Sequence, residues 1–87
     1  MYCLVVYDVN TDRVAKVLKF MRRHMHWIQN SVFEGVVTKA QLREIKAGLN
    51  NIIKQNEDSI YFFITRDKKY MEKEILGKEV SSTDNFI

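Results

Sequence analysis

The chain of 87 residues has no proline, three glycines and one cysteine. Little proline and glycine means that no stretch has the composition of a flexible linker, so we expect a single domain over residues 1–87. Cys3 has no partner in the chain, which argues against a disulfide framework and favours a reducing cytoplasm. The sequence also lacks a signal peptide and an apolar run long enough to span a bilayer, so we expect no membrane partner.

Acidic residues are absent from Arg13 to Gln29, within a chain of net charge +3. Residues 11–25 have the apolar spacing of one helix. The opposite face of that helix carries a basic ridge, flanked by Arg13 and Arg22 and formed by Lys16, Lys19 and Arg23. A basic face is often only solvated, but solubility helices normally interleave both charge signs. The ridge therefore favours contact with a phosphate backbone.

Three further segments have the composition of β-strands. Residues 2–7 and 59–65 are rich in Val, Ile and aromatic side chains without polar alternation, which is typical of strands buried on both faces. Residues 27–37 are also strand-like, but their alternation breaks at Asn30 and Ser31. They form either one kinked strand or two short strands that meet at a bend.

A second helix is expected after the break at Thr38. Thr38 and Gln41 match the capping-box pattern, and the apolar spacing continues to about Lys54. Gly48 lies inside this helix, where it lowers helix stability and marks a close contact.

The order of these elements predicts an α+β fold, a ferredoxin-like sandwich with two helices on one face of an antiparallel sheet. The strands are apolar on both faces, and so short a chain has no further element to cover the second face. We therefore expect a homodimer formed through that face. The tail, residues 78–87, ends in Phe86-Ile87 and is expected to add a strand to the partner's sheet edge.

Asp8 ends the first apolar strand, where the chain turns polar before the first helix. An acid at this position has two interpretations. It either ends the strand or caps the helix, or it belongs to a binding site at the rim of the sheet.

Two motifs resemble one known family, the small CRISPR-associated adaptation proteins called Cas-two. They are Tyr7-Asp8-Val9 and the string Gln29-x-Ser31-Val32-Phe33-Glu34-Gly35, and the likeness extends from Met1 to Thr65 and more weakly to the end of the chain. The resemblance implies a ferredoxin-like homodimer that takes part in CRISPR spacer acquisition on double-stranded DNA beside the integrase Cas-one. Several members are described as magnesium-dependent endonucleases that act on single-stranded RNA or double-stranded DNA.

The resemblance also assigns residues. The family's metal-binding and catalytic aspartate falls on Asp8 with Tyr7 before it, an arginine early in the first helix falls on Arg13, and the motif phenylalanine falls on Phe33. One Asp8 from each subunit would offer Mg²⁺ two carboxylates. Trp27 stands where many members have an arginine, and the loop after Asp8 lacks the arginines of other members. These departures weigh against nuclease activity more than against the fold.

Two other functions fit a domain of this kind: a ribonuclease toxin similar to VapD, and a dimeric regulatory module that binds a small ligand. The basic ridge favours a nucleic-acid role over the ligand module, whereas only the family string separates the adaptation subunit from the toxin.

Overall fold

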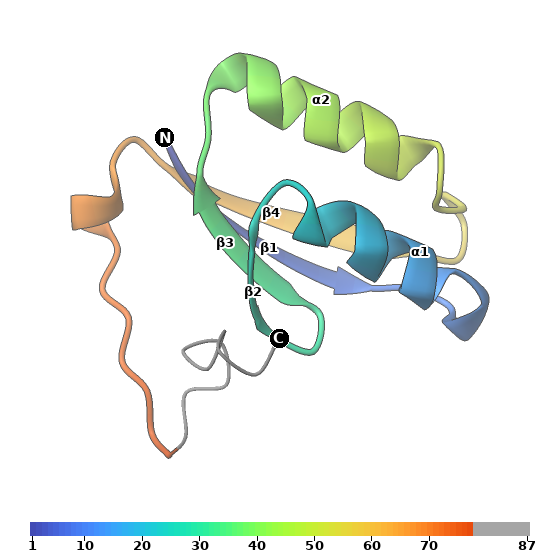
Figure 1. Ribbon diagram of the computed structural model, residues 1–87, viewed down its shortest axis with the longest axis horizontal. Coiled ribbons are helices and arrows are strands. Elements are labelled where there is room, and N and C mark those ends of the chain that lie inside the picture. The colour runs from blue at the N-terminus through green and yellow to red at the C-terminus, as the bar shows by residue number, and fades with distance from the viewer. Residues whose placement is uncertain (78–87) are drawn as a thin grey trace.

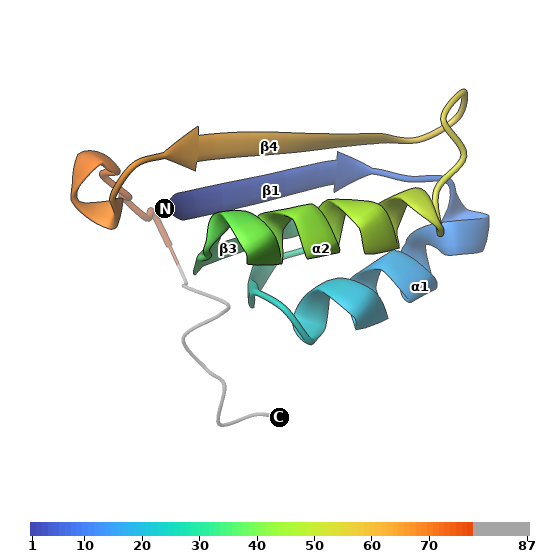
Figure 2. The same ribbon diagram turned by 90° about the horizontal axis from the view of Figure 1, so that it is seen from above.

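The computed structural model describes residues 1–77, which form a four-stranded antiparallel sheet with both helices on one face (Figures 1 and 2). In chain order the elements are β1 (Tyr2–Asp8), α1 (Thr11–Arg22), β2 (His26–Gln29), β3 (Val32–Val36), α2 (Lys39–Asn50), β4 (Ser59–Thr65) and the short 3₁₀ helix η1 (Lys68–Tyr70). The strand order β2-β3-β1-β4 confirms the ferredoxin-like fold. No helix within residues 1–77 is both long and apolar enough to cross a membrane. The expected tail strand lies outside the described residues.

β1 is an inner strand that contributes to both faces of the sheet. It pairs with β3 on one side and with β4 on the other, which leaves β4 at the edge. Its alternating side chains Cys3, Val5 and Tyr7 belong to the core beneath the helices. Tyr2, Leu4 and Val6 alternate with them on the opposite face, called the open face because neither α1 nor α2 covers it. On this face Tyr2 is buried, and Leu4 and Val6 are half-buried. The absence of polar alternation in the sequence thus reflects one face covered by helices and one open face.

α1 ends at Arg22, three residues earlier than the predicted segment 11–25. Its N-cap is Asn10, whose side chain accepts a hydrogen bond from the Asp12 backbone N–H at 2.9 Å. The helix ends early because β2 already begins at His26, so the chain must reverse within the intervening residues.

The predicted strand over residues 27–37 is divided into β2 and β3. Asn30 lies in the left-handed region with φ of 38°, a conformation that Asn tolerates better than most residues. The turn is held by Trp27, whose indole N–H donates to the Asn30 carbonyl at 2.9 Å. Of the two alternatives for this segment, the hairpin of two short strands is confirmed.

α2 has the predicted capping box but ends at Asn50, before the predicted end near residue 54. Thr38 and Gln41 exchange side-chain and backbone hydrogen bonds at 2.8 and 3.0 Å. The predicted close contact at Gly48 is also confirmed, because a Cβ atom there would lie 2.3 Å from Cζ of Phe20 on α1. Gly48 therefore lets the two helices pack closely.

Candidate nucleic-acid interface

Asp8 is an exposed carboxylate at the end of β1. Its backbone is paired with Ser59 at the start of β4, so it belongs to the sheet and not to a free loop. Within residues 1–77 its side chain makes no hydrogen bond and no ion pair. The carboxylate is thus free to meet a ligand at this end of the sheet.

Each chain offers a divalent cation one exposed carboxylate at the end of β1, that of Asp8. No cluster of three or more His, Cys, Asp and Glu side chains in the described part of the chain has the geometry to hold a metal ion. Mg²⁺ needs only one or two carboxylates, because it keeps several of its waters. The donor set of one chain therefore fits a largely hydrated ion, and two copies of Asp8 would fit it better.

Arg13 is buried, in contrast to the exposed position that the sequence predicted for it. Its Nε atom donates to Asp58 at 2.6 Å, and its Nη2 atom donates to Asp58 at 3.0 Å and to Glu57 at 2.8 Å. The Arg13 guanidinium holds the pKa of the Asp58 carboxyl well below its usual range. Arg13 lies one and two helical turns before the buried residues Val17 and Met21, and this spacing of four was the signal for its burial.

The basic ridge itself lies on the exposed face of α1. Lys16, Lys19 and Arg23 are all exposed, and none forms an ion pair within residues 1–77. Arg23 lies over the Phe20 ring at 5.8 Å, and the flanking Arg22 lies over the Trp27 ring at 5.5 Å. These aromatic contacts orient two guanidinium groups while leaving them accessible to an anion.

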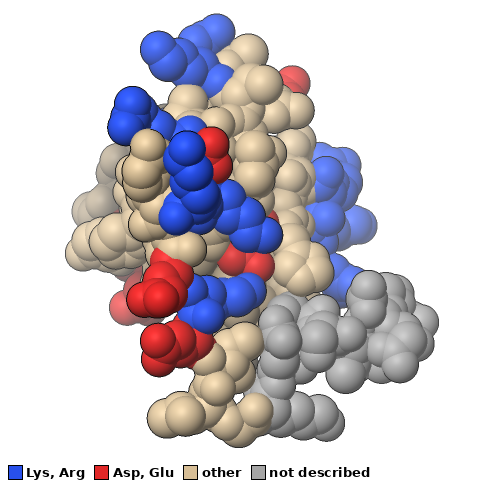
Figure 3. Space-filling model, turned by 90° about the vertical axis from the view of Figure 1, so that its left-hand side faces the viewer, with Lys and Arg blue, Asp and Glu red and all other residues tan. Residues whose placement is uncertain are grey.

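A second group of cations lies at the end of the sheet opposite Asp8, and it was not predicted from the sequence. Lys39, Arg43 and Lys46 of α2 line a hollow of about 220 Å³ beside Met1. Lys39 also lines a neighbouring hollow of about 430 Å³ with Arg66. Lys and Arg side chains gather over the upper part of this side of the molecule (Figure 3). The sequence shows the helical spacing of Lys39, Arg43 and Lys46, but Glu44 lies between them, so they did not form an uninterrupted basic run.

Tyr7 and Phe33, the two aromatic residues that the family resemblance assigns beside Asp8, lie in the core. Both are buried, and their rings stack with centroids 6.2 Å apart and an interplanar angle of 19°. They support the end of β1 from beneath the helices, and neither reaches the surface.

Glu34 of the family string is also a packing residue. It is buried on the open face of the sheet, where it accepts hydrogen bonds from the Tyr2 hydroxyl and, at 2.9 Å, from Nζ of Lys73. Burial alone would raise the pKa of Glu34, but these two hydrogen bonds outweigh it and the pKa lies below its ordinary value. The family string, residues 29–35, thus spans the turn between β2 and β3, and its glutamate contributes to packing.

The open face of the sheet carries large apolar side chains in contact with solvent. Val36, Tyr61 and Phe63 are 68%, 60% and 50% exposed. The rings of Tyr61 and Phe63 stack on each other with centroids 6.4 Å apart. Exposed apolar surface of this kind is typical of protein interaction sites.

Comparisons with known proteins agree with this architecture. Residues 1–73 match the family model described as CRISPR associated protein Cas2. Two proteins named CRISPR-associated endoribonuclease Cas2 are similar over 87 residues. The one from Methanosarcina acetivorans is 47% identical with both chains fully covered, and the one from Methanocaldococcus jannaschii is 46% identical, covering 100% of this chain and 76% of the relative.

Solved structures give the same result. A crystal structure described as cas2 superposes with a TM-score of 0.84 at 42% identity, covering 93% of this chain and 91% of the other. The Streptococcus pyogenes Cas2 crystallised at pH 6.5 superposes with a TM-score of 0.75 at 38% identity, covering 88% of this chain and 100% of the other. The hairpin motif, the strand order and these relatives together establish that the chain belongs to the Cas2 family.

Proposed function

We propose that this protein is a subunit of CRISPR spacer acquisition, which binds double-stranded DNA as a homodimer together with the integrase Cas-one. The observation that carries the proposal is the exposed ridge of Lys16, Lys19 and Arg23, which has no acidic partner within residues 1–77. Family membership supports the same role.

The ridge has dimensions that suit a phosphate backbone. From Lys16 to Arg23 it extends about 10 Å along α1, at about 1.5 Å per residue. Duplex DNA carries one charge per roughly 1.7 Å of its axis, so each of the three cations has a phosphate within reach. Contacts of this kind hold DNA without reading its sequence. Arg13 is left out of this surface because Asp58 and Glu57 occupy its guanidinium.

The homodimer would form through the open face of the sheet. Burying the exposed side chains of Val36, Tyr61 and Phe63 against a second copy would remove them from water, which is the main favourable term in association. A two-fold axis would present two ridges to one duplex and bring two copies of Asp8 into one assembly.

A metal-dependent endonuclease activity on single-stranded RNA or double-stranded DNA is a further part of the proposal. Relatives carry the name endoribonuclease, and Asp8 is the accessible carboxylate that would hold Mg²⁺. When bound, Mg²⁺ would neutralise phosphoryl charge and lower the pKa of a bound water. The ridge would hold the substrate backbone, and the architectural role in integration would be the main one.

The test is duplex binding as a function of salt, with the ridge variant Lys16→Ala/Lys19→Ala/Arg23→Ala. Each lost phosphate contact should flatten the log–log salt slope by about 0.9 and weaken binding equally on unrelated duplexes. A charge-matched control, Lys54→Ala/Lys68→Ala/Lys69→Ala, removes three cations elsewhere and should change the slope much less. If the ridge variant keeps the wild-type affinity and slope, the ridge is only a solvated face.

A further inference from the structure

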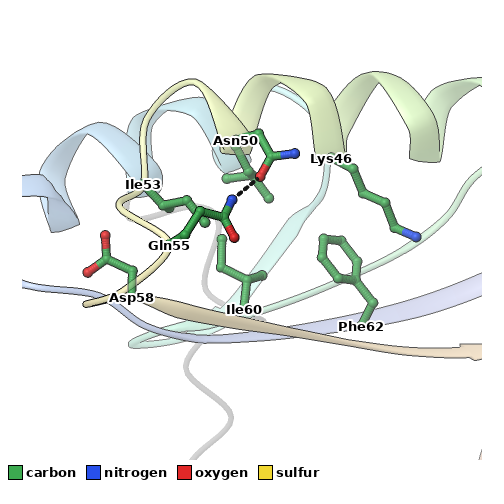
Figure 4. A pocket seen from close by; sticks show the side chains of 8 residues that line it. Lys46, Asn50, Ile53, Gln55, Asp58, Ile60 and Phe62 are labelled. Atoms are coloured by element: carbon green, nitrogen blue, oxygen red, sulfur yellow. Dashed lines mark hydrogen bonds between the residues drawn. The ribbon is translucent and has the colours of Figure 1, made fainter.

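Asp58 is a buried carboxylate that joins three segments of the chain. Its side chain is fully buried and accepts hydrogen bonds from the backbone N–H of Asn10 at 2.9 Å and of Lys54 at 2.8 Å. Two more come from Nε and Nη2 of Arg13 at 2.6 and 3.0 Å. Asp58 lies where the α2–β4 connection meets β4, at one end of a hollow lined by Ile60 and other residues (Figure 4).

Asp58 and its neighbour Ser59 hold the backbone on both sides of Asp8. Ser59, the residue after Asp58, pairs with Asp8 across the β1–β4 ladder. Asn10, two residues after Asp8, donates its backbone N–H to Asp58. Ser59 thus holds the strand end that carries Asp8, and Asp58 itself holds the loop that follows.

Arg13 makes this arrangement stable. A buried carboxylate without a cation would be costly, and the guanidinium supplies both charge and a two-atom contact that fixes the orientation of the carboxylate. Glu57 binds the outer side of the same guanidinium, but its side chain is 43% exposed, and the backbone N–H of Asn10 donates to Asp58 and not to Glu57. The buried Arg13–Asp58 pair therefore positions the loop, and the exposed Arg13–Glu57 pair is peripheral to it.

We propose that Asp58 and Arg13 are positioning residues for Asp8, holding the β1–α1 junction so that the backbone that carries the Asp8 carboxylate stays in one position. This inference rests on the proposed function, in which Asp8 holds a divalent cation. It assigns a role to two residues that never touch the ion. If the junction were more mobile, the Asp8 carboxylate would still be present, but its affinity for the cation would be lower.

The test is Mn²⁺ binding to the full-length protein, measured by electron paramagnetic resonance, with hydrogen exchange of the Asn10 amide measured in parallel. Asp58→Asn should weaken Mn²⁺ binding about tenfold, within the range seen when outer partners of metal ligands are changed. It should also speed exchange at Asn10. Glu57→Gln, the matched control, should leave both readouts near the wild-type values. A purely structural role would lower global stability without changing Mn²⁺ affinity in the folded protein.

A second pair of variants isolates one hydrogen bond in case Asp58→Asn fails to fold. Asn10 has φ of −55°, which proline adopts, so Asn10→Pro removes the N–H donated to Asp58 without forcing that dihedral. Asn10→Ala loses the same helix cap but keeps the N–H. We expect weaker Mn²⁺ binding for Asn10→Pro than for Asn10→Ala, and equal affinities would overturn the proposal.

The positioning role of Asp58 and the metal site at Asp8 are tested separately. If Asp8→Asn weakens Mn²⁺ binding while Asp58→Asn and Asn10→Pro do not, positioning is wrong and the site at Asp8 stands. If Asp8→Asn binds Mn²⁺ like the wild type, the metal site itself is wrong and the positioning role falls with it.

Discussion

Asp8 and Asp58 are two carboxylates at the same end of the sheet in opposite environments. Asp8 is exposed and unpaired within residues 1–77, whereas Asp58 is fully buried and accepts four hydrogen bonds. An acid that is already saturated contributes to structure, while an accessible one is available to a ligand. We therefore expect a structural role for Asp58 and a ligand-binding role for Asp8.

Asp8→Asn should abolish metal-dependent cleavage and leave folding and dimerisation intact, because the side chain is exposed and makes no hydrogen bond or ion pair within residues 1–77. Two facing carboxylates without a cation would repel each other, so the metal-free dimer of the variant should be at least as stable as the wild type. Cleavage assays and thermal unfolding on one preparation check both statements. Retained cleavage would remove Asp8 from the active site.

The stability of the protein should decrease at acid pH through Asp58. Its hydrogen bonds with Arg13 hold the pKa of the carboxyl below its ordinary value, so the unfolded state takes up a proton at higher pH than the folded state. The stabilisation is complete above the unfolded pKa of about 3.9 and is lost as the pH falls below it. Urea unfolding from about pH 6 to about pH 3 should show a shallower pH dependence for Asp58→Asn than for the wild type. Equal pH dependences would contradict this.

Single residues were the hardest to predict where a distant partner decides their environment. In α1 the one acid is the adjacent Asp12, which does not bind Arg13, whereas the partner Asp58 lies 45 positions away. Residue spacing along one helix carries no information about such a pair. The position of Asp8 at the end of β1 was easier to predict because it depends only on neighbouring residues, whereas its role in binding a metal stays a prediction.

At the scale of elements, the strands were predicted well and the helix ends less so. β4 matches the predicted residues 59–65 because its apolar composition ends sharply at both sides. α1 and α2 end early, at Arg22 and Asn50, since apolar residues beyond these points still pack on the core although the backbone has left the helix. Periodicity reports which side chains are buried, not where helical hydrogen bonding stops.

Gly48→Ala should destabilise the protein through the contact between α1 and α2. The added Cβ would lie 2.3 Å from Cζ of Phe20, so the ring must move. Overpacking costs about 1–3 kcal/mol and alanine regains about 1 kcal/mol of helix propensity, so we expect a net loss of up to about 2 kcal/mol. Denaturant unfolding measures it. In a Phe20→Leu background the same change should cost less, and an equal cost in both backgrounds would exclude the clash.

For the whole molecule, the two faces of the sheet have different surfaces. The face covered by helices turns the basic ridge outward, and the open face presents Tyr61 and Phe63 to solvent. A second copy on the open face would leave both ridges outside the interface. The proposed self-association and the proposed binding of DNA would therefore not compete for the same surface.

Phe63→Glu should convert the dimer into a monomer, because it would place a charge in the centre of an apolar interface. The matched control is Val14→Glu, which adds the same charge at an exposed position on α1, away from the open face, and should leave the dimer intact. Sedimentation at micromolar concentration distinguishes the two. A wild-type protein that sediments as a stable monomer would contradict the dimer.

The most direct test of the central claim is spacer integration with Cas-one, reconstituted on duplex DNA with the wild type, Asp8→Asn and the ridge variant. If the protein acts mainly by holding DNA, Asp8→Asn should integrate spacers like the wild type, while Lys16→Ala/Lys19→Ala/Arg23→Ala should integrate poorly and lose more activity as salt rises. Loss of integration in Asp8→Asn, with full integration by the ridge variant, would contradict the account.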